Sequence, residues 1–153
     1  MPRGSRRLPD ECVERLRVAD LILHAGDFVA AAFLEELRAL GPPVEAVYGN
    51  ADEPFLKESL EKQRVLEVAG ARIGMVHNAG PASGREERLL RRFPGCGAIV
   101  FGHTHVPIVD RWEGVWLLNP GSPTERGRSP TKTMIELRVD GATLVPKLVE
   151  FGP

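Results

Sequence analysis

Cysteine is scarce in this chain: Cys12 and Cys96 are the only two among 153 residues, and they form no CxxC pattern. A disulfide framework or a zinc knuckle needs paired cysteines, so neither is predicted. Two isolated cysteines fit a reducing compartment, and we expect a cytoplasmic location. The sequence also lacks any apolar run near the roughly 20 residues that span a bilayer, so no membrane partner is expected.

An excess of charge of either sign is absent as well. Lys and Arg number 20 and Asp and Glu number 21, which gives a formal net charge of −1. No global positive field would attract nucleic acid or anionic lipid, and no specific nucleic-acid partner is indicated. A secretory signal is not predicted, because the basic segment 3–7 is followed by LPDECVERL instead of an apolar run. Partners must therefore be inferred from a site.

The apolar pattern alternates between helical and strand-like segments in the first part of the chain. Residues 10–19 and 29–40 have helical periodicity, and the short apolar runs 21–24 and 44–48 follow them in turn. This alternation implies parallel strands joined by helical crossovers. The last third differs, because alternating runs joined by EG and DG dipeptides predict β-hairpins. We expect a single α/β domain over residues 1–153, with two packed sheets and helices outside.

Polar residues follow four of the strand-like runs, in LILHAGD, VEAVYGN, IGMVHN and IVFGHTH. The carboxyl ends of parallel strands line the usual ligand crevice of an α/β sheet. We therefore expect five side chains to meet there: Asp27, Asn50, His77, His103 and His105. One carboxylate, one amide oxygen and three imidazoles suit Mn²⁺, Fe²⁺, Ni²⁺ or Zn²⁺ better than Ca²⁺ or Mg²⁺. The pattern predicts a transition-metal site.

Each of these residues also has an ordinary structural explanation. Asp27 could cap a helix that begins near Val29, and Asn50 could supply a left-handed turn residue. His77 could be a half-exposed strand histidine, and the two histidines of GHTH, which would point to one side of an extended segment, could coincide at a strand end. The joint occurrence favours the metal site, since three of the four histidines stand at such ends. The fourth, His24, is expected to orient a ligand.

Five motifs, LILHAGD, YGNADE, MVHNAG, FGHTHVP and NPGS, occur in the order and spacing seen in calcineurin-like metallophosphoesterases. From about Leu8 to about Leu137 the chain resembles the small bacterial and archaeal phosphodiesterase branch of that superfamily. The resemblance implies an αββα sandwich of two mixed β-sheets flanked by helices. It also implies a divalent transition metal, Mn²⁺ first with Ni²⁺, Fe²⁺ or Zn²⁺ as other choices, and a small phosphoester substrate.

The resemblance further implies a site for two metals that share the Asp27 carboxylate, since a carboxylate can face two cations about 3.5–4 Å apart. One metal would take Asp27, Asn50, His77 and His103, and the other would take Asp27 and His105. A metal-activated hydroxide would then attack the phosphorus of a phosphodiester. The same five residues are thus expected to be the metal ligands and the catalytic set.

The chain departs from the family pattern in two places. The second metal would also need a DxH motif from the family's first strand, and no DxH stands before Asp27. One carboxylate against two divalent cations leaves strong repulsion, so we expect this chain to bind one metal firmly and its activity to be impaired. Ala51 stands where many relatives have a histidine that can protonate a leaving group, so activated leaving groups should be favoured. Asp52 could take that histidine's place in part, as a supporting carboxylate.

A missing first strand has a structural consequence too. The run 21–23 would lose a backbone partner and expose an apolar edge, which makes a homo-oligomer one open outcome. We interpret MPRGSRRLP as the loop that leaves this strand, with the native start codon lying upstream. The alternative function is a non-catalytic protein-interaction scaffold of the same fold, similar to the small retromer subunit. Asn50 and His77 favour the enzyme, because a scaffold has little reason to keep such ligands.

Overall fold

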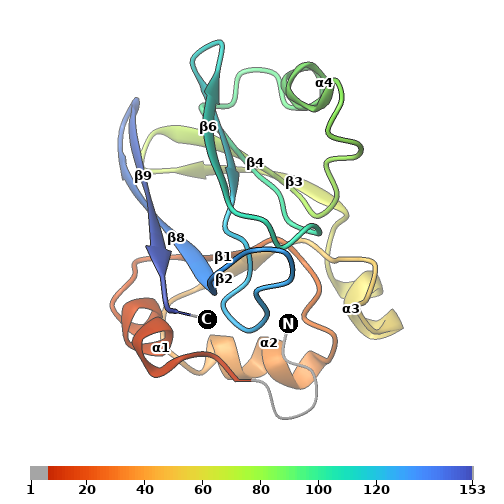
Figure 1. The fold of residues 1–153 in the computed structure, drawn as a ribbon, viewed down its shortest axis with the longest axis vertical. Helices are drawn as coiled ribbons and strands as arrows, with labels where there is room; N and C mark the ends of the chain where they lie inside the picture. Colours follow the sequence, from red (N-terminus) through yellow and green to blue (C-terminus); the bar gives the residue numbers. More distant parts are fainter. Residues whose placement is uncertain (1–6, 153) are drawn as a thin grey trace.

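The computed structural model describes residues 7–152, so most of the segment MPRGSRRLP lies outside the described residues. Its helices are α1 (Asp10–Arg17), α2 (Ala31–Arg38), α3 (Pro54–Ser59) and α4 (Arg85–Arg92). Its strands are β1 (Ile22–His24), β2 (Val44–Ala46), β3 (Gln63–Val68), β4 (Ala71–Val76), β5 (Ala98–Val100), β6 (Ile108–Trp112), β7 (Val115–Asn119), β8 (Thr133–Asp140) and β9 (Thr143–Glu150). Figure 1 shows the strands between α4 at the top and the other helices below.

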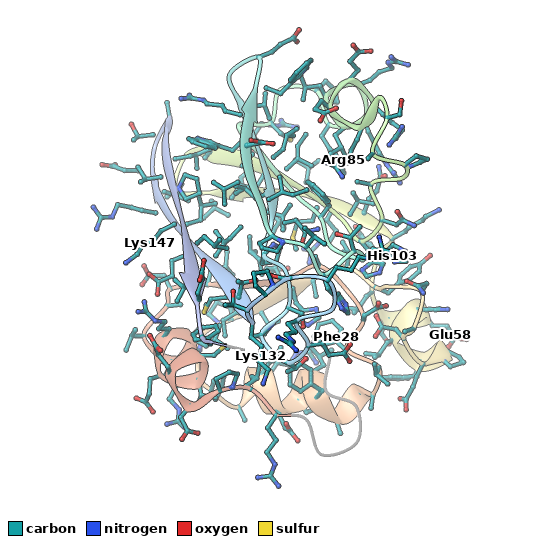
Figure 2. All side chains as sticks on the ribbon, in the orientation of Figure 1. Phe28, Glu58, Arg85, His103, Lys132 and Lys147 are labelled. Atoms are coloured by element: carbon teal, nitrogen blue, oxygen red, sulfur yellow. The ribbon has the colours of Figure 1, made fainter. Side chains whose placement is uncertain are left out.

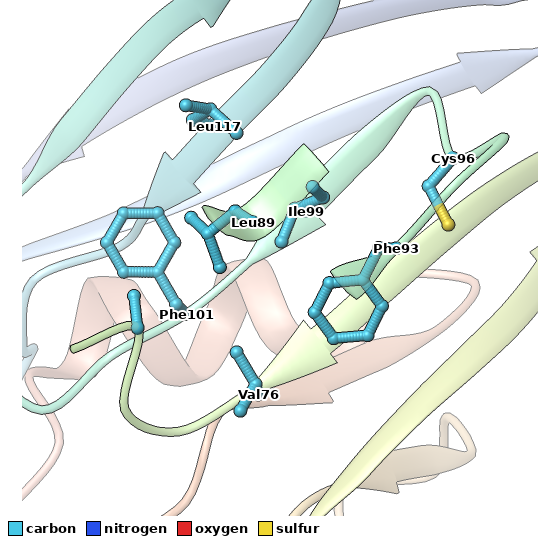
Figure 3. Close-up of a cluster of buried hydrophobic side chains, with 8 residues drawn as sticks. Val76, Leu89, Phe93, Cys96, Ile99, Phe101 and Leu117 are labelled. Atoms are coloured by element: carbon cyan, nitrogen blue, oxygen red, sulfur yellow. The ribbon is translucent and has the colours of Figure 1, made fainter. Parts of the chain in front are cut away.

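A five-stranded mixed sheet, in the order β3-β4-β5-β7-β6, forms one central layer. Strands β4, β5 and β7 run parallel, and the hairpins β3–β4 and β6–β7 add an antiparallel strand at each edge. Helix α4 covers one face, where Leu89 packs among Phe93, Ile99 and Phe101 (Figure 3). Full burial of such a side chain stabilises the fold by about 1.5–3 kcal/mol. The parallel pairing of β4 with β5 brings their carboxyl ends side by side.

The second β-layer consists of two small sheets, the parallel pair β1–β2 and the antiparallel hairpin β8–β9. Both pack on the other face of the five-stranded sheet, where Leu23 and Ile135 contact the cluster that contains Ile73 and Val100. The predicted second mixed sheet is thus divided, because no strand within residues 7–152 pairs with the edge of β1 opposite β2. The order of layers is still helix, sheet, sheet, helix, as predicted.

A cavity of about 670 Å³ lies along this edge of β1, between α1 and β8. Apolar side chains such as Leu16, Leu23 and Leu137 line it, and His103 and His105 lie among the lining residues as well. The edge at residues 21–23 thus has no strand partner on this side among the described residues, but it is not exposed as predicted, because Ile22 is only 4% exposed. The cavity reaches the same end of β1 that carries the candidate ligands.

The helices α1, α2 and α3 form the outer layer over β1 and β2. Phe33, Leu34 and Leu37 of α2 are buried with Leu56 of α3, and Leu16 of α1 packs against this cluster. Within α2, Phe33, Leu34 and Leu37 are separated by one, three and four residues, which is the helical periodicity predicted for residues 29–40. None of the described helices is long and apolar enough to cross a membrane.

Candidate metal centre

The candidate ligands follow the carboxyl ends of β1, β2, β4 and β5. Asp27 lies three residues after β1, Asn50 lies four residues after β2, and His77 comes directly after β4. His103 and His105 lie in the loop that follows β5. Parallel pairing makes neighbours of the loops after β1 and β2 and of the loops after β4 and β5, and the packing of the two β-layers brings the two pairs of loops together. Figure 2 shows His103 above Phe28 in the middle of the view.

Three ligand atoms from other loops meet around Nε2 of His77. Asn50 Oδ1 lies 2.9 Å from it, and Asp27 Oδ2 and His103 Nδ1 each lie 3.3 Å from it. Asn50 Oδ1 and His103 Nδ1 are 3.1 Å apart. Among the described residues, Asp27, His77 and His103 form a group whose ligand atoms all lie within 4.8 Å of one another. The structure therefore brings four of the five predicted residues together.

The hydrogen-bond chemistry of this cluster fits a cation. Nδ1 of His77 lies 2.7 Å from the Ala25 carbonyl oxygen, which can only accept, so Nδ1 carries the proton and the neutral ring has its lone pair at Nε2. That lone pair faces Asn50 Oδ1 and Asp27 Oδ2, which are also acceptors. A proton on Nε2 could be donated to only one of these oxygens at a time, whereas a cation can be bound by all of the ligand atoms together. The oxygen and imidazole donors suit a first-row transition metal.

The Asp27 carboxylate is held in its charged form. Burial acts to raise its pKa, but the His77 imidazole, when Nε2 carries a proton, and the Ala51 N–H outweigh burial and lower the pKa to about 2. The Ala51 N–H donates to Oδ1 at 2.9 Å, while Oδ2 faces His77. One oxygen is therefore fixed by the backbone and the other is directed at the cluster.

The ordinary explanations of Asp27 and Asn50 are wrong in this structure. Helix α2 begins at Ala31 and its N-cap residue is Ala30, and the Ala31 N–H is accepted by Glu53, so Asp27 is not the cap of this helix. Asn50 is not among the residues with positive φ, so it supplies no left-handed turn. His77 is only 5% exposed, so it is not a half-exposed strand histidine. All three side chains are instead directed at one another.

The backbone of the site loops adopts conformations that non-glycine residues rarely take. The φ angles are 62° at Asp27, 72° at Val29, 72° at His103 and 60° at His105. Each such residue costs about 1–3 kcal/mol and persists only where its surroundings hold it in place. Val29 is β-branched, for which a positive φ is a genuine outlier. Four of the six described non-glycine residues with positive φ are thus candidate ligands or lie within two residues of one, and the other two, Ala69 and Glu113, lie in hairpin turns.

His105 stands apart from the other four residues. The prediction that His103 and His105 lie in an extended segment is wrong, because both are left-handed and the loop turns between them. His105 lies outside the group of ligand atoms around His77, and its Nδ1 is 3.8 Å from Oε2 of Glu125. Burial lowers the pKa of His105, and Glu125 opposes that shift. The neutral imidazole is the form that can bind a metal.

Glycines and a buried amide allow the site loops to touch. A side chain at Gly49 would collide with the Asp27 carboxylate, and one at Gly26 would lie 2.7 Å from the Gly49 nitrogen. Asn119, in the NPGS motif, is fully buried and donates to the Gly102 carbonyl at 3.1 Å. It therefore fixes the loop that carries the GHTH histidines.

His24, for which a role in orienting a ligand is predicted, supports the residue before Asp27. Its Nδ1 accepts the Gly26 N–H at 3.1 Å, and its ring stacks on Phe28 with 3.7 Å between the ring centroids. Burial lowers the pKa of His24 to about 3, so the ring is neutral at physiological pH. Its ring contacts are with Phe28 of the loop after β1 and with Phe33 of α2.

Asp52 supports the site in a way that the sequence does not predict. It is 5% exposed, and its carboxylate accepts the backbone N–H groups of Asp27, Val29 and Gly49. From the motifs, Asp52 is expected only to replace in part a histidine found in relatives. From local sequence rules, an acidic side chain near a turn is expected to accept backbone N–H groups of its own loop. Only the tertiary contacts show that Asp52 holds a second loop as well.

Comparison with known proteins identifies relatives along almost the whole chain. A family model described as the calcineurin-like phosphoesterase superfamily domain matches residues 4–142. A probable metallophosphoesterase of Methanothermobacter thermautotrophicus is 34% identical over 154 residues, which cover 99% of this chain and 88% of the relative. A phosphodiesterase of Methanocaldococcus jannaschii is 24% identical over 116 residues, which cover 67% of this chain and 66% of the relative.

Solved structures share the fold. Wild-type Vps29 from Entamoeba histolytica, in a crystal structure of its complex with Zn²⁺, superposes with a TM-score of 0.77 and 21% sequence identity. The match covers 98% of this chain and 93% of the Vps29 chain. At 21% sequence identity, this similarity shows only that the two proteins share a fold.

Proposed function

The chain belongs to the calcineurin-like phosphoesterase superfamily, and on that premise we propose that it is a metal-dependent phosphodiesterase. The observation that carries the proposal is the meeting of Asp27 Oδ2, Asn50 Oδ1 and His103 Nδ1 around His77 Nε2. The archaeal relatives support a phosphoesterase, and the similarity to one named a phosphodiesterase supports diesters as the substrate class. Mn²⁺ is the metal that we propose.

The four residues would each contribute differently to the metal. Asp27 contributes the negative charge, and its lowered pKa keeps that charge at neutral pH. Asn50 contributes a neutral oxygen, and the Ala25 carbonyl holds the His77 ring so that Nε2 faces the site. His103 is exposed, so the site opens to solvent and substrate on its side. A divalent metal held there supplies positive charge for the phosphoryl oxygens and acidifies water.

Leaving-group chemistry should limit the substrates. At position 51 the chain has alanine, whose N–H is already engaged with Asp27 Oδ1 and whose side chain cannot donate a proton. A leaving group that needs protonation would therefore depart slowly. We propose that diesters with acidic alcohols or phenols as leaving groups are hydrolysed best.

The test is hydrolysis of bis(4-nitrophenyl) phosphate by the metal-free chain supplemented with Mn²⁺, with binding followed by the electron paramagnetic resonance signal of free Mn²⁺. We expect one firmly bound equivalent per chain and weak Mn²⁺-dependent hydrolysis, since a single metal should leave the activity impaired. The matched variant His77→Gln keeps a polar side chain and should lose both. Binding and hydrolysis that survive in His77→Gln would contradict the proposal. A parent chain with neither property would favour the scaffold alternative.

A further inference from the structure

Asp52 lies next to the candidate metal site, and its carboxylate accepts hydrogen bonds from three backbone N–H groups. Its Oδ2 accepts the N–H of Gly49 at 2.7 Å and the N–H of Asp27 at 3.1 Å, and its Oδ1 accepts the N–H of Val29 at 2.8 Å. All three donors are backbone groups, and the side chain is 5% exposed. The buried negative charge is therefore stabilised by two separate loops, one after β1 and one after β2.

These contacts act on the two residues of the first loop whose backbone is least favourable. Asp27 has a φ of 62° and Val29 a φ of 72°, and both direct their N–H groups at Asp52. The neighbouring Ala51 N–H holds Asp27 Oδ1 at 2.9 Å. Residues 51 and 52 thus hold Asp27 at both ends, by its carboxylate and by its backbone. The remaining oxygen, Oδ2, is left directed at His77.

We propose that Asp52 is a positioning residue that sets the metal affinity of the site through Asp27. Its carboxylate keeps the backbone of Asp27 left-handed, and this conformation places Oδ2 beside His77 Nε2. The proposal rests on the proposed function, since it assumes that Asp27 binds a metal. Partners that orient metal ligands typically change metal affinity by about 10–100-fold when they are removed.

The test compares Asp52→Asn with Glu53→Gln. An amide has one accepting and one donating end, so the side chain introduced by Asp52→Asn would turn an NH₂ group toward at least one of the three backbone donors. Glu53 is the matched control, because its exposed carboxylate accepts a single backbone N–H, that of Ala31, at 3.3 Å. We expect Mn²⁺ affinity to fall about 10–100-fold in Asp52→Asn and to change by less than about twofold in Glu53→Gln.

A second readout separates positioning from loss of stability. The visible absorption spectrum of the Co²⁺-loaded chain should change in Asp52→Asn, because the geometry of Asp27 changes, while circular dichroism shows a folded protein. If Asp52→Asn does not fold, the same measurements are made in a Val29→Gly background, in which glycine relieves the left-handed strain. The Val29→Gly variant is then the reference for the double variant that carries Val29→Gly and Asp52→Asn.

The outcomes distinguish this inference from the proposed function. A folded Asp52→Asn chain that binds Mn²⁺ as tightly as the parent overturns the inference, even if its melting temperature falls. A parent chain that binds no Mn²⁺ overturns the proposed function and the inference with it. Weaker binding with an altered Co²⁺ spectrum in Asp52→Asn, but not in Glu53→Gln, is the expected result.

Discussion

The two sides of the candidate site are built in different ways. On one side Asp27, His77 and His103 have ligand atoms within 4.8 Å of one another, and the strands that position them are paired. On the other side His105 pairs with Glu125 at 3.8 Å, in a loop region that follows β7. Strand pairing and the packing of the two β-layers bring together the loops that carry the four clustered residues, whereas His105 is directed toward Glu125 by a turn of the loop that also carries His103. Variants on the two sides should behave differently.

The largest effect is expected from Asp27→Asn, which removes the carboxylate that faces His77. Mn²⁺ affinity should fall by more than about 100-fold, because loss of a charged ligand exceeds the typical effect of losing a partner that orients one. The charge-matched control is Asp110→Asn, at an exposed position on β6. Titration of Mn²⁺ into both proteins checks the prediction. A similar affinity in the two would show that Asp27 is not a ligand.

The contrast between the two sides is tested directly by His103→Gln and His105→Gln. The first should weaken binding of the single firmly held Mn²⁺ by about 10–100-fold, and the second by less than about twofold. The reason is that only His103 has a ring nitrogen next to Asn50 and His77. Calorimetric titration measures both constants. Equal losses would mean that His105 belongs to the same metal.

A smaller effect is expected where the two loops touch. In Gly49→Ala the new methyl group would collide with the Asp27 carboxylate and lie 2.5 Å from the Asp27 nitrogen, so the loops must separate. Mn²⁺ affinity should fall about tenfold, at the lower end of the range for orienting partners. Gly114→Ala is the control, because it strains the β6–β7 turn, with φ +80° and nothing within 4 Å. It should lower the melting temperature without changing Mn²⁺ affinity.

The smallest effect is expected from Val29→Gly, which should stabilise the metal-free protein. Glycine removes the steric penalty of the left-handed conformation at φ 72°, and the net gain should be about 1 kcal/mol. Urea unfolding measures the change. Mn²⁺ affinity should stay within about twofold, because the hydrogen bond from the residue 29 N–H to Asp52 is kept. A loss of stability would instead show that packing of the Val29 side chain outweighs the strain.

Several features could be predicted from the sequence because their causes are local. The hairpins β6–β7 and β8–β9 follow from alternating side chains and from turns that contain Gly114 and Gly141. The gathering of Asp27, Asn50, His77 and His103 follows from polar residues at the ends of apolar runs, which parallel pairing brings together. Pairing alone does not join the two sheets, so the meeting of Asp27 and Asn50 with His77 and His103 also depends on the expected packing of one sheet on the other.

The sequence by itself determined the family, the order of helices and strands, and the residues that gather around His77, because periodicity and motif spacing are properties of short segments. The tertiary structure alone decided the left-handed backbone of Asp27, the three hydrogen bonds of Asp52 and the separation of His105 from His103. Each of these features depends on contacts between loops that are far apart in the chain. Hydrogen bonds between the loops offset the backbone strain within them, and this cannot be seen in the sequence of any one segment.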